Sequence, residues 1–472
     1  MKGITRATVQ LGRCEALSRR EMLGKLWRIG LTSSLATAAM GFVSRTTGAY
    51  PVQGADAGRA LKLSREDEQT LDELERASFL FFWEQASPYT GLVKDRSQAN
   101  GPDPRDLASI AATGFGLTAL CIADFRGFLK SSQARARVLA TLRFLRKRMP
   151  HEHGFFYHFV QMHTGERAGQ SEVSSIDTAI LLCGVLTCRQ HFEDPEIRQL
   201  ATEVYERVDW PWLLAGAKTL SHGWKPESGF LKPRWDHYCE LMMIYLLGLG
   251  SRSHPLPAET WEAWSRPVQE YEGIRFIWSD APLFVHQYSH AWFDFWGKRD
   301  RHADYFQNSV LATEVHRRFC LSLRKRFPRF GEDLWGITAS DSAHGYVVWG
   351  GPPPMGPLDG TVVPCAAGGS IVFLPQEALR VLGTMRQQYG KRALKRYGFV
   401  DAFNPHTGWS SPDVVAINTG ITMLMAENAR SQFVWNTFMK NEEARRGMER
   451  AGFNPDSVTP RRGGRPRRLS RR

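Results

Sequence analysis

The sequence predicts an all-α protein in which inner and outer helices alternate around a ring, an α/α toroid. Apolar residues recur at intervals of three and four along most of the 472 residues, as in Leu71, Leu74, Ala77 and Phe81, which is the period of one helix face. Runs in which apolar and polar residues alternate, as they do in strands, are few. Two kinds of helical segment follow one another, one with a narrow apolar stripe and one that is apolar on nearly all sides.

The helical segments begin after Ser64, and loops rich in Gly, Pro and aromatic residues separate them. The expected helices span residues 66–86, 107–125, 132–149, 174–192, 195–207, 236–250, 258–268, 300–325, 375–389 and 418–440. Segments 132–149 and 195–207 have a charged face and should lie outside, whereas 174–192 and 236–250 should be enclosed. No repeat of fixed period supports the ring, so its prediction depends on this alternation.

The net charge of +13 suggests nucleic-acid binding until the charges are located. Lys and Arg exceed Asp and Glu by six in residues 1–49 and by seven in residues 457–472. Residues 50–456 are therefore formally neutral, and we expect no nucleic-acid partner.

The first 49 residues have the pattern of a signal peptide. Arg19 and Arg20 form a twin-arginine motif, an apolar stretch follows over residues 30–43, and small residues end the segment. The stretch is shorter than the roughly 20 residues that span a bilayer, although an uncleaved anchor is the alternative. We expect export by the twin-arginine route to the periplasm or medium, with a mature domain over residues 50–456.

Residues 457–472 form a basic tail of low complexity, which we expect to be disordered. The tail could bind an anionic envelope surface, or it could be a solvated extension without such a role. Seven cysteines occur without a C-x-x-C motif; Cys14 falls in the signal, and the rest should be buried as small apolar residues.

Glu240 is the most informative single residue because it is the only charge in the apolar run 238–247. Asp236 is expected to cap the helix, which would place Glu240 one turn inside it. Desolvation would raise the pKa of Glu240 and suit it to general-acid catalysis, whereas the helix N-terminus would lower that pKa. The alternative is a buried glutamate paired with a local Arg or Tyr.

A second pair of acids precedes the apolar run 179–186. Ser174 and Asp177 form a capping box, so Asp177 has either this structural role or a catalytic one. Glu172 lies before the cap and has no such local role. If the inner helices point the same way, Glu172 and Glu240 share one end of the ring, as a pair of acids in glycoside hydrolysis must.

Aromatic residues are frequent in the expected loops, and flat rings with a polar edge suit sugar binding. These residues are Trp235, Tyr288, His290, Trp292, Phe293, Trp335, Trp349 and Trp409. Signals for other chemistries are weak: the histidines of residues 151–163 are scattered, and no Walker loop, G-x-S-x-G or His-Glu-x-x-His motif occurs. We therefore expect neither a metal nor a cofactor.

Six motifs, in this order over residues 65–455, resemble the bacterial glycoamylase-like family, which includes the endo-β-1,2-glucanases and the related domain of cyclic β-1,2-glucan synthases. The motifs are GLVKDRS (91–97), ATGFGL (112–117), SEVSSID (171–177), QYSHAWFD (287–294), WGITASD (335–341) and YGFVDAFNP (397–405). The resemblance implies an (α/α)6 barrel and hydrolysis of a β-glucan, with β-1,2-glucan as the leading substrate, by an acid/base and inverting mechanism without a metal.

The resemblance also implies site residues. Glu240 matches the general acid, and Glu172 and Asp177 match acidic positions of the cleft. One of the loop aspartates Asp95, Asp341, Asp359 and Asp401, or Glu172 itself, would hold the attacking water. The residues expected to bind substrate are Asp95, Arg96, Trp235, His290, Trp292, Trp335, Asp341, Asp359, Asp401 and Trp409.

One position departs from the family pattern. The last inner helix opens Ile417-Asn418-Thr419-Gly420 where the pattern has Ile-Asp-Gln-Gly. Asn caps a helix as well as Asp does, but it cannot take a proton at neutral pH. This change keeps open a barrel that binds glycan without cleaving it. A polysaccharide lyase on a similar toroid is a third interpretation, against which the neutral body argues.

Overall fold

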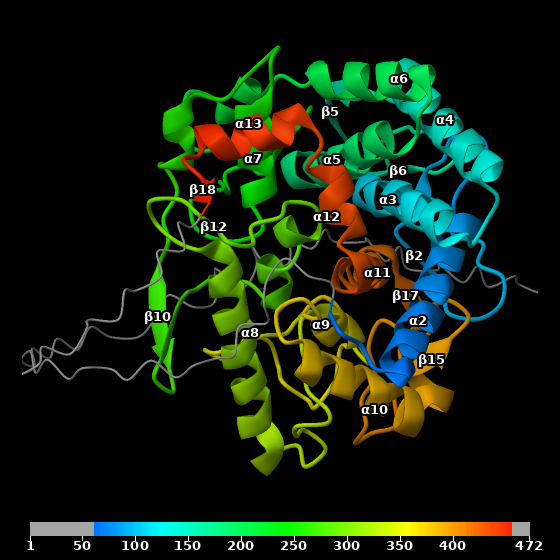
Figure 1. Ribbon diagram of the computed structural model, residues 1–472, viewed down its shortest axis with the longest axis vertical. Coiled ribbons are helices and arrows are strands. Elements are labelled where there is room, and N and C mark those ends of the chain that lie inside the picture. The colour runs from blue at the N-terminus through cyan, green and yellow to red at the C-terminus, as the bar shows by residue number, and fades with distance from the viewer. Residues whose placement is uncertain (1–60, 456–472) are drawn as a thin grey trace, which may run out of the picture. The chain divides into compact units, whose positions relative to one another are not determined.

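The computed structural model describes residues 61–455, which form a ring of inner and outer helices (Figure 1). The inner helices are buried: α3 (Ile110–Arg126), α5 (Ser175–His191), α7 (Met242–Gly250), α9 (Pro364–Gly368) and α11 (Ala416–Ser431). The outer helices are α2 (Arg65–Glu84), α4 (Ser131–Lys147), α6 (Pro195–Glu206), α8 (Tyr305–Ser322), α10 (Pro375–Ala393) and α13 (Glu442–Arg450). The short α12 (Phe433–Phe438) follows α11.

The sixth place of the inner ring is taken by two buried 3-10 turns, η3 (Leu283–His286) and η4 (Ser289–Ala291). The Ser289 hydroxyl accepts a hydrogen bond from the Met243 N–H of α7 at 3.1 Å. On the other side, the Gln287 amide donates to the carbonyl of Ala366 in α9 at 3.0 Å. The predicted (α/α)6 barrel is confirmed.

The alternation of helix types is also confirmed. Helices α5 and α7 are buried almost throughout, whereas α4 and α6 bury one stripe and place charged side chains outside. On that outer face Arg143 of α4 forms a bidentate ion pair with Glu196 of α6. The six cysteines between residues 61 and 455 are buried and form no disulfide, as expected.

The inner helices run parallel, because the residue pairs in contact advance in the same direction along both helices. Near the start of α3 and in the middle of α5, Gly114 and Gly184 are in backbone contact, so that a Cβ on Gly184 would lie 2.2 Å from the Gly114 carbonyl oxygen. Further along, the sulfur atoms of Cys121 and Cys188 are 3.5 Å apart. The ends of α5 and α7 meet at Glu443, which accepts a hydrogen bond from Arg189 and packs against Gly250. These helices therefore begin at one end of the ring.

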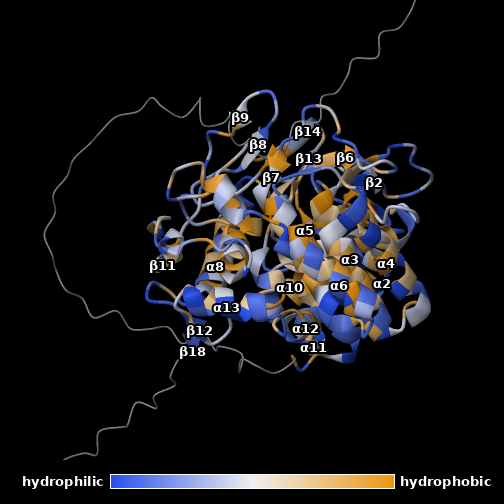
Figure 2. Cartoon of the chain, turned by 90° about the horizontal axis from the view of Figure 1, so that it is seen from above, coloured by the Kyte–Doolittle hydropathy of each residue, from blue (hydrophilic) through white to orange (hydrophobic). Residues whose placement is uncertain are grey.

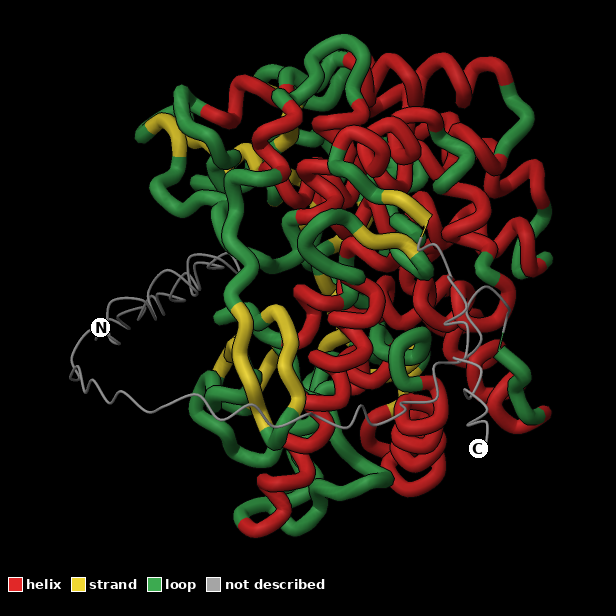
Figure 3. Tube along the Cα trace, turned by 60° about the vertical axis from the view of Figure 1, so that its left-hand side comes forward, coloured by secondary structure: helices red, strands yellow, loops and turns green. Residues whose placement is uncertain are grey.

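Short strands at that end form a structure that we call the rim. Its strands are β1 (Val93–Lys94), β2 (Arg96–Gln98), β3 (Leu107–Ser109), β6 (Phe159–Gln161), β7 (Val173–Ser174), β8 (Gly223–Lys225) and β17 (Asp413–Val415). Antiparallel pairs join β2 to β17, β3 to both β1 and β6, and β7 to β8. Strands β3, β7 and β17 lead directly into α3, α5 and α11. The strands lie along one end of the helices (Figure 2), and loops gather on one side of the molecule (Figure 3).

The remaining strands form small hairpins and pairs. They are β4 (His151–Glu152), β5 (Phe155–Phe156), β9 (Gly229–Phe230), β10 (Val268–Tyr271), β11 (Ile274–Ile277), β12 (Lys298–Arg299), β13 (Ala339–Ser342), β14 (Gly345–Val348), β15 (Leu394–Lys395), β16 (Gly398–Phe399) and β18 (Asn454–Pro455).

Several expected helix bounds were wrong. The largest error concerns α7, which begins at Met242 and not at Asp236, because the Asp236 carboxylate pairs with His237 instead of capping backbone N–H groups. Glu240 consequently precedes the helix. Segment 258–268 forms only the 3-10 turn η2 (Ala258–Trp261), since Pro267 disfavours helix at the residue before it. Segment 418–440 is two helices, because Gln432 has a left-handed φ of 60°.

Other bounds shift by a few residues. Residues 107–109 form β3, and Ser109 caps α3 by accepting from the Ala112 N–H at 3.3 Å. Asp304 caps α8, which therefore begins at Tyr305. Among residues 61–455 no helix is long and apolar enough to cross a membrane. The expected signal peptide with Cys14 and the basic tail lie outside the described residues.

The glycine contact between α3 and α5 gives a first prediction. Gly184→Ala should lower the free energy of unfolding by about 2 kcal/mol, because the new methyl group would overlap the Gly114 carbonyl and push the helices apart. Gly383→Ala in α10 is the matched control, since a Cβ there meets nothing within 4 Å and should leave stability equal or higher by up to about 1 kcal/mol. Urea unfolding measures both. Equal stability of the two variants would contradict the close contact.

Candidate active site

The acids expected in the site lie at the rim, where the inner helices begin. Glu172 directly precedes β7, and Asp177 is in the first turn of α5. Glu240 lies two residues before α7. The Trp235 indole N–H donates to the Ser175 hydroxyl at 2.7 Å and so ties the segment before α7 to the start of α5. Because α5 and α7 end together at Glu443, Glu172 and Glu240 belong to the same end of the ring.

His158 holds Glu172 and Asp177 together. Its Nδ1 lies 3.1 Å from Glu172 Oε1 and 3.6 Å from Asp177 Oδ2. Its backbone is fixed as well, since the His158 N–H donates to the Glu172 carbonyl at 2.9 Å and its ring stacks on Phe159. The imidazole thus lies between two carboxyl groups that are nearly buried. Nothing in the sequence distinguished His158 from the other scattered histidines.

The cap that the sequence predicted at the start of α5 is present, with Ser174 as the N-cap residue. The Ser174 hydroxyl accepts from the Asp177 N–H at 3.3 Å and donates to Asp177 Oδ2 at 2.5 Å. Asp177 thus has its structural role, and its carboxylate also reaches His158.

The same three side chains could hold a cation. Ligand atoms of His158, Glu172 and Asp177 all lie within 4.8 Å of one another, and within residues 61–455 this is the one such group. An imidazole with two carboxylates suits a divalent transition metal. In the structure the imidazole is instead hydrogen-bonded to Glu172.

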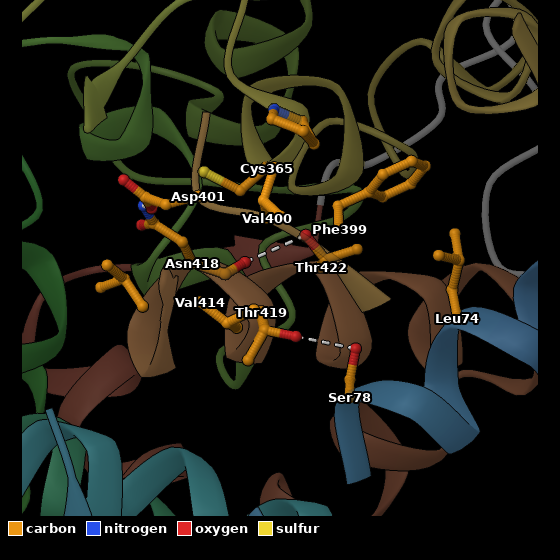
Figure 4. A pocket seen from close by; sticks show the side chains of 12 residues that line it. Leu74, Ser78, Cys365, Phe399, Val400, Asp401, Val414, Asn418, Thr419 and Thr422 are labelled. Carbon is orange, nitrogen blue, oxygen red and sulfur yellow. Dashed lines mark hydrogen bonds between the residues drawn. The ribbon is translucent and has the colours of Figure 1, made fainter. Parts of the chain in front are cut away.

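A second group of acids surrounds the start of α11. Asp401 is 3% exposed; its Oδ1 accepts from the Asn418 amide at 2.6 Å and its Oδ2 from the Asp341 N–H at 2.7 Å. Figure 4 shows the Asn418 side chain directed at Asp401, at the edge of a small pocket. Burial, and then the charge of Asp341, raise the pKa of Asp401 to about 7. Asp401 can therefore gain or lose a proton near neutral pH.

Arg96 is the cation of this second group. It donates to Asp341 Oδ1 at 2.9 Å and to Asp95 at 3.2 Å, and it lies 3.8 Å from Asp413. Burial alone would lower the pKa of Arg96, but the charges of Asp95, Asp341 and Asp401 keep it above its ordinary value. Arg105 supplies a second cation through a bidentate pair with Asp413. The rim therefore combines carboxyl groups with arginines that pair with them.

Three residues expected to bind substrate are in the core instead. His290, Trp292 and Trp335 are each 0% exposed. His290 hydrogen-bonds Ser309, and burial lowers its pKa to about 3; the Trp292 indole donates to Thr118. Trp235 is buried under His222, with ring centroids 4.0 Å apart. The expectation that these rings face a glycan is corrected, because they pack between helices.

The remaining two, Asp359 and Trp409, lie on separate loops. Both line a hollow of about 500 Å³ together with His344 and Asn404. Trp409 is half-buried, so part of its ring is accessible.

The contact between Asn418 and Asp401 gives a prediction on pH dependence. Asn418→Asp would place a second carboxyl group 2.6 Å from Asp401 and raise the pKa of the pair further. A carboxyl group whose pKa is higher in the folded than in the unfolded state loses stability as pH rises from about 4 through the folded value. The melting temperature of the variant should therefore fall more steeply between pH 5 and pH 8 than that of the wild type.

Asn436→Asp, at an exposed position of α12, is the control and should follow the wild-type slope. A wild-type slope in Asn418→Asp as well would show that the two side chains do not interact as the structure has them.

Known proteins are similar to this chain in sequence and in structure. Residues 232–442 match the Glycoamylase family model, described as "Putative glucoamylase". A curated exo β-1,2-glucooligosaccharide sophorohydrolase of Parabacteroides distasonis is 27% identical over 424 residues, which cover 81% of this chain and 58% of that protein. The chain thus spans little more than half the length of this relative.

Two solved structures are also similar. The endo-β-1,2-glucanase of Chitinophaga pinensis, in complex with sophorotriose and glucose, has a TM-score of 0.76 at 26% identity, over 83% of this chain and 99% of that one. A β-1,2-glucanase of Parabacteroides distasonis has a TM-score of 0.76 at 25% identity, over 82% and 60% of the two chains. The resemblance seen in the sequence is confirmed, since the chain is similar to the Glycoamylase family over residues 232–442 and to solved β-1,2-glucanases over most of its length.

Proposed function

We propose that this protein is a glycoside hydrolase that cleaves β-1,2-linked glucan. The observation that carries the proposal is the gathering of carboxyl groups at one end of a ring that is similar, over more than 80% of the chain, to β-1,2-glucanases. Hydrolysis of a glycosidic bond needs one carboxylic acid to protonate the leaving oxygen and one carboxylate to act on the opposite side. The rim has several carboxyl groups and cations to balance them.

In the proposed reaction Glu240 is the general acid, and another acid of the rim activates water as the base, so that the anomeric configuration inverts. Glu172 and Asp177, which His158 holds together, are one source of the base. Asp341 and Asp401 are the other, because Asp341, to which Arg96 donates a hydrogen bond, lies beside Asp401, whose pKa is raised to about 7. Substrate would also contact Asp95 and Arg96.

Glu240→Gln tests the assignment of the acid. The amide has the same shape but no proton to transfer, so hydrolysis of β-1,2-glucan should fall at least about 100-fold while the protein stays folded. The control Glu259→Gln changes an exposed acid of the next turn and should keep wild-type activity. Products are separated by size after incubation of the full-length chain with β-1,2-, β-1,3-, β-1,4- and α-1,4-glucans.

Each result of that assay decides something. Cleavage of another glucan in place of β-1,2-glucan would support glycoside hydrolysis but exclude β-1,2-glucan as the substrate. Full activity of Glu240→Gln would exclude Glu240 as the acid. Binding of glucan by a wild-type chain that cleaves none would favour the non-catalytic barrel, and ultraviolet-absorbing products would indicate a lyase.

We also propose that the chain is exported by the twin-arginine route and that residues 457–472 attach it to an anionic envelope surface. The support is the motif at Arg19 and Arg20 and the seven arginines of the tail. Changing Arg19 and Arg20 together to Lys should leave the protein in the cytoplasmic fraction. A chain without the tail should be exported, but it should dissociate from the envelope at a salt concentration low enough to retain the full-length chain. Export of the double variant would contradict the first proposal, and unchanged retention of the shortened chain the second.

A further inference from the structure

We propose that the hollow beside Trp409 binds glucosyl residues of the substrate that lie away from the cleaved bond. This inference depends on the proposed function and adds to it a site that gives longer chains an advantage. The hollow has a volume of about 500 Å³, and its lining includes His344, Asp359, Thr361, Asn404, Thr407 and Trp409. Three separate loops contribute these residues, so the hollow is a feature of the folded domain.

The loop that carries Trp409 is held rigidly. Asn404 Oδ1 accepts hydrogen bonds from the N–H groups of His406 and Thr407 at 2.9 and 3.1 Å, and its amide donates to the Asp359 carbonyl at 3.1 Å. The Asn404 N–H donates to the Trp409 carbonyl at 2.8 Å. These bonds fix the backbone at Trp409, and its side chain packs against the hydrophobic core. The ring therefore has a defined position before any ligand arrives, which reduces the entropy that binding costs.

The same loop connects the hollow to the acids of the rim. Its base is closed by the Asp401 N–H donating to the Asp413 carbonyl at 2.9 Å and by Ser411, whose hydroxyl donates to Asp341 at 3.0 Å. A bridge between Phe403 and Ser410 continues the pairing toward the tip. Two residues, Ala402 and Phe403, separate Asp401 from Asn404, which corresponds to about 10 Å along an extended backbone. An oligosaccharide bound at the acids could thus extend along the loop to Trp409.

The chemistry of the lining selects a neutral sugar. The accessible part of the Trp409 ring offers a flat apolar surface for a pyranose face. Asp359, whose Oδ1 accepts from the Thr361 N–H at 2.8 Å, offers a carboxylate for sugar hydroxyls. The same carboxylate would repel a phosphate or sulfate group. A glucan without charged substituents is the ligand class that satisfies both features.

The test compares β-1,2-gluco-oligosaccharides of increasing length, from sophorose upward, on the full-length chain. In the wild type, KM should fall as the chain lengthens. In Trp409→Ala that gain should be lost, so that KM for the longest oligosaccharides rises about tenfold and KM no longer falls as the chain lengthens. Trp409→Phe keeps an aromatic face and should restore most of the gain.

Trp83→Ala is the matched control. Trp83 is also half-buried, but it lies on outer helix α2 with Arg137 stacked over its ring at 4.3 Å. This variant should keep the wild-type length dependence. Titration calorimetry with the same oligosaccharides in the Glu240→Gln background measures binding apart from turnover.

The outcomes separate the two proposals. A wild type that cleaves β-1,2-glucan, together with a Trp409→Ala variant of unchanged length dependence, would overturn the binding role of the hollow and leave the hydrolase intact. A wild type that neither binds nor cleaves any of these oligosaccharides would overturn the proposed function and, with it, the hollow as part of a glucan site.

Discussion

The close parallel packing of the inner helices is the constraint on which the rest of this structure depends. Gly114 and Gly184 bring α3 and α5 into backbone contact, and a side chain at either position would separate them. Parallel helices have their first turns at the same end of the ring. The strands that lead into α3, α5 and α11 therefore lie at one end, where β3 pairs with β1 and β6, β7 with β8, and β17 with β2. Residues distant in the sequence, such as Arg96 and Asp413, meet for this reason.

Bringing several carboxyl groups to one end creates repulsion that the structure offsets locally. His158 lies between Glu172 and Asp177, and Arg96 lies among Asp95, Asp341 and Asp413. Asp401 is contacted by the Asn418 amide and the Asp341 N–H, and no cation of residues 61–455 forms an ion pair with it; its pKa rises to about 7. Asn418, which departs from the family pattern, therefore has a physical role. It avoids a third carboxylate beside Asp401 and Asp341, which would increase the repulsion. Such unequal environments are what acid/base catalysis requires.

The ring, the order of its helices and the capping of α5 by Ser174 could be predicted from the sequence, because each depends on local spacing. It did not reveal where α7 begins, since Asp236 is engaged by His237, which also contacts the distant Asp280. It could not show that Trp292 and Trp335 are core residues, because the sequence of a loop does not indicate whether a helix covers its aromatic rings. His158 was missed because its contact with Glu172 arises from backbone pairing across a loop. The acidic residues could be selected from the sequence, whereas the residues that contact them could be identified only from the three-dimensional structure.

The central claim is that acids at the common end of the inner helices hydrolyse β-1,2-glucan through one acid and one base acting on opposite sides of the bond. Proton NMR of the anomeric signals in the first minutes of the reaction tests it most directly. The account predicts that the new reducing ends appear first as the α-anomer and then equilibrate, as inversion of a β-linkage demands. Initial formation of the β-anomer would show retention and a nucleophilic carboxylate, and would contradict the proposed roles of the rim acids.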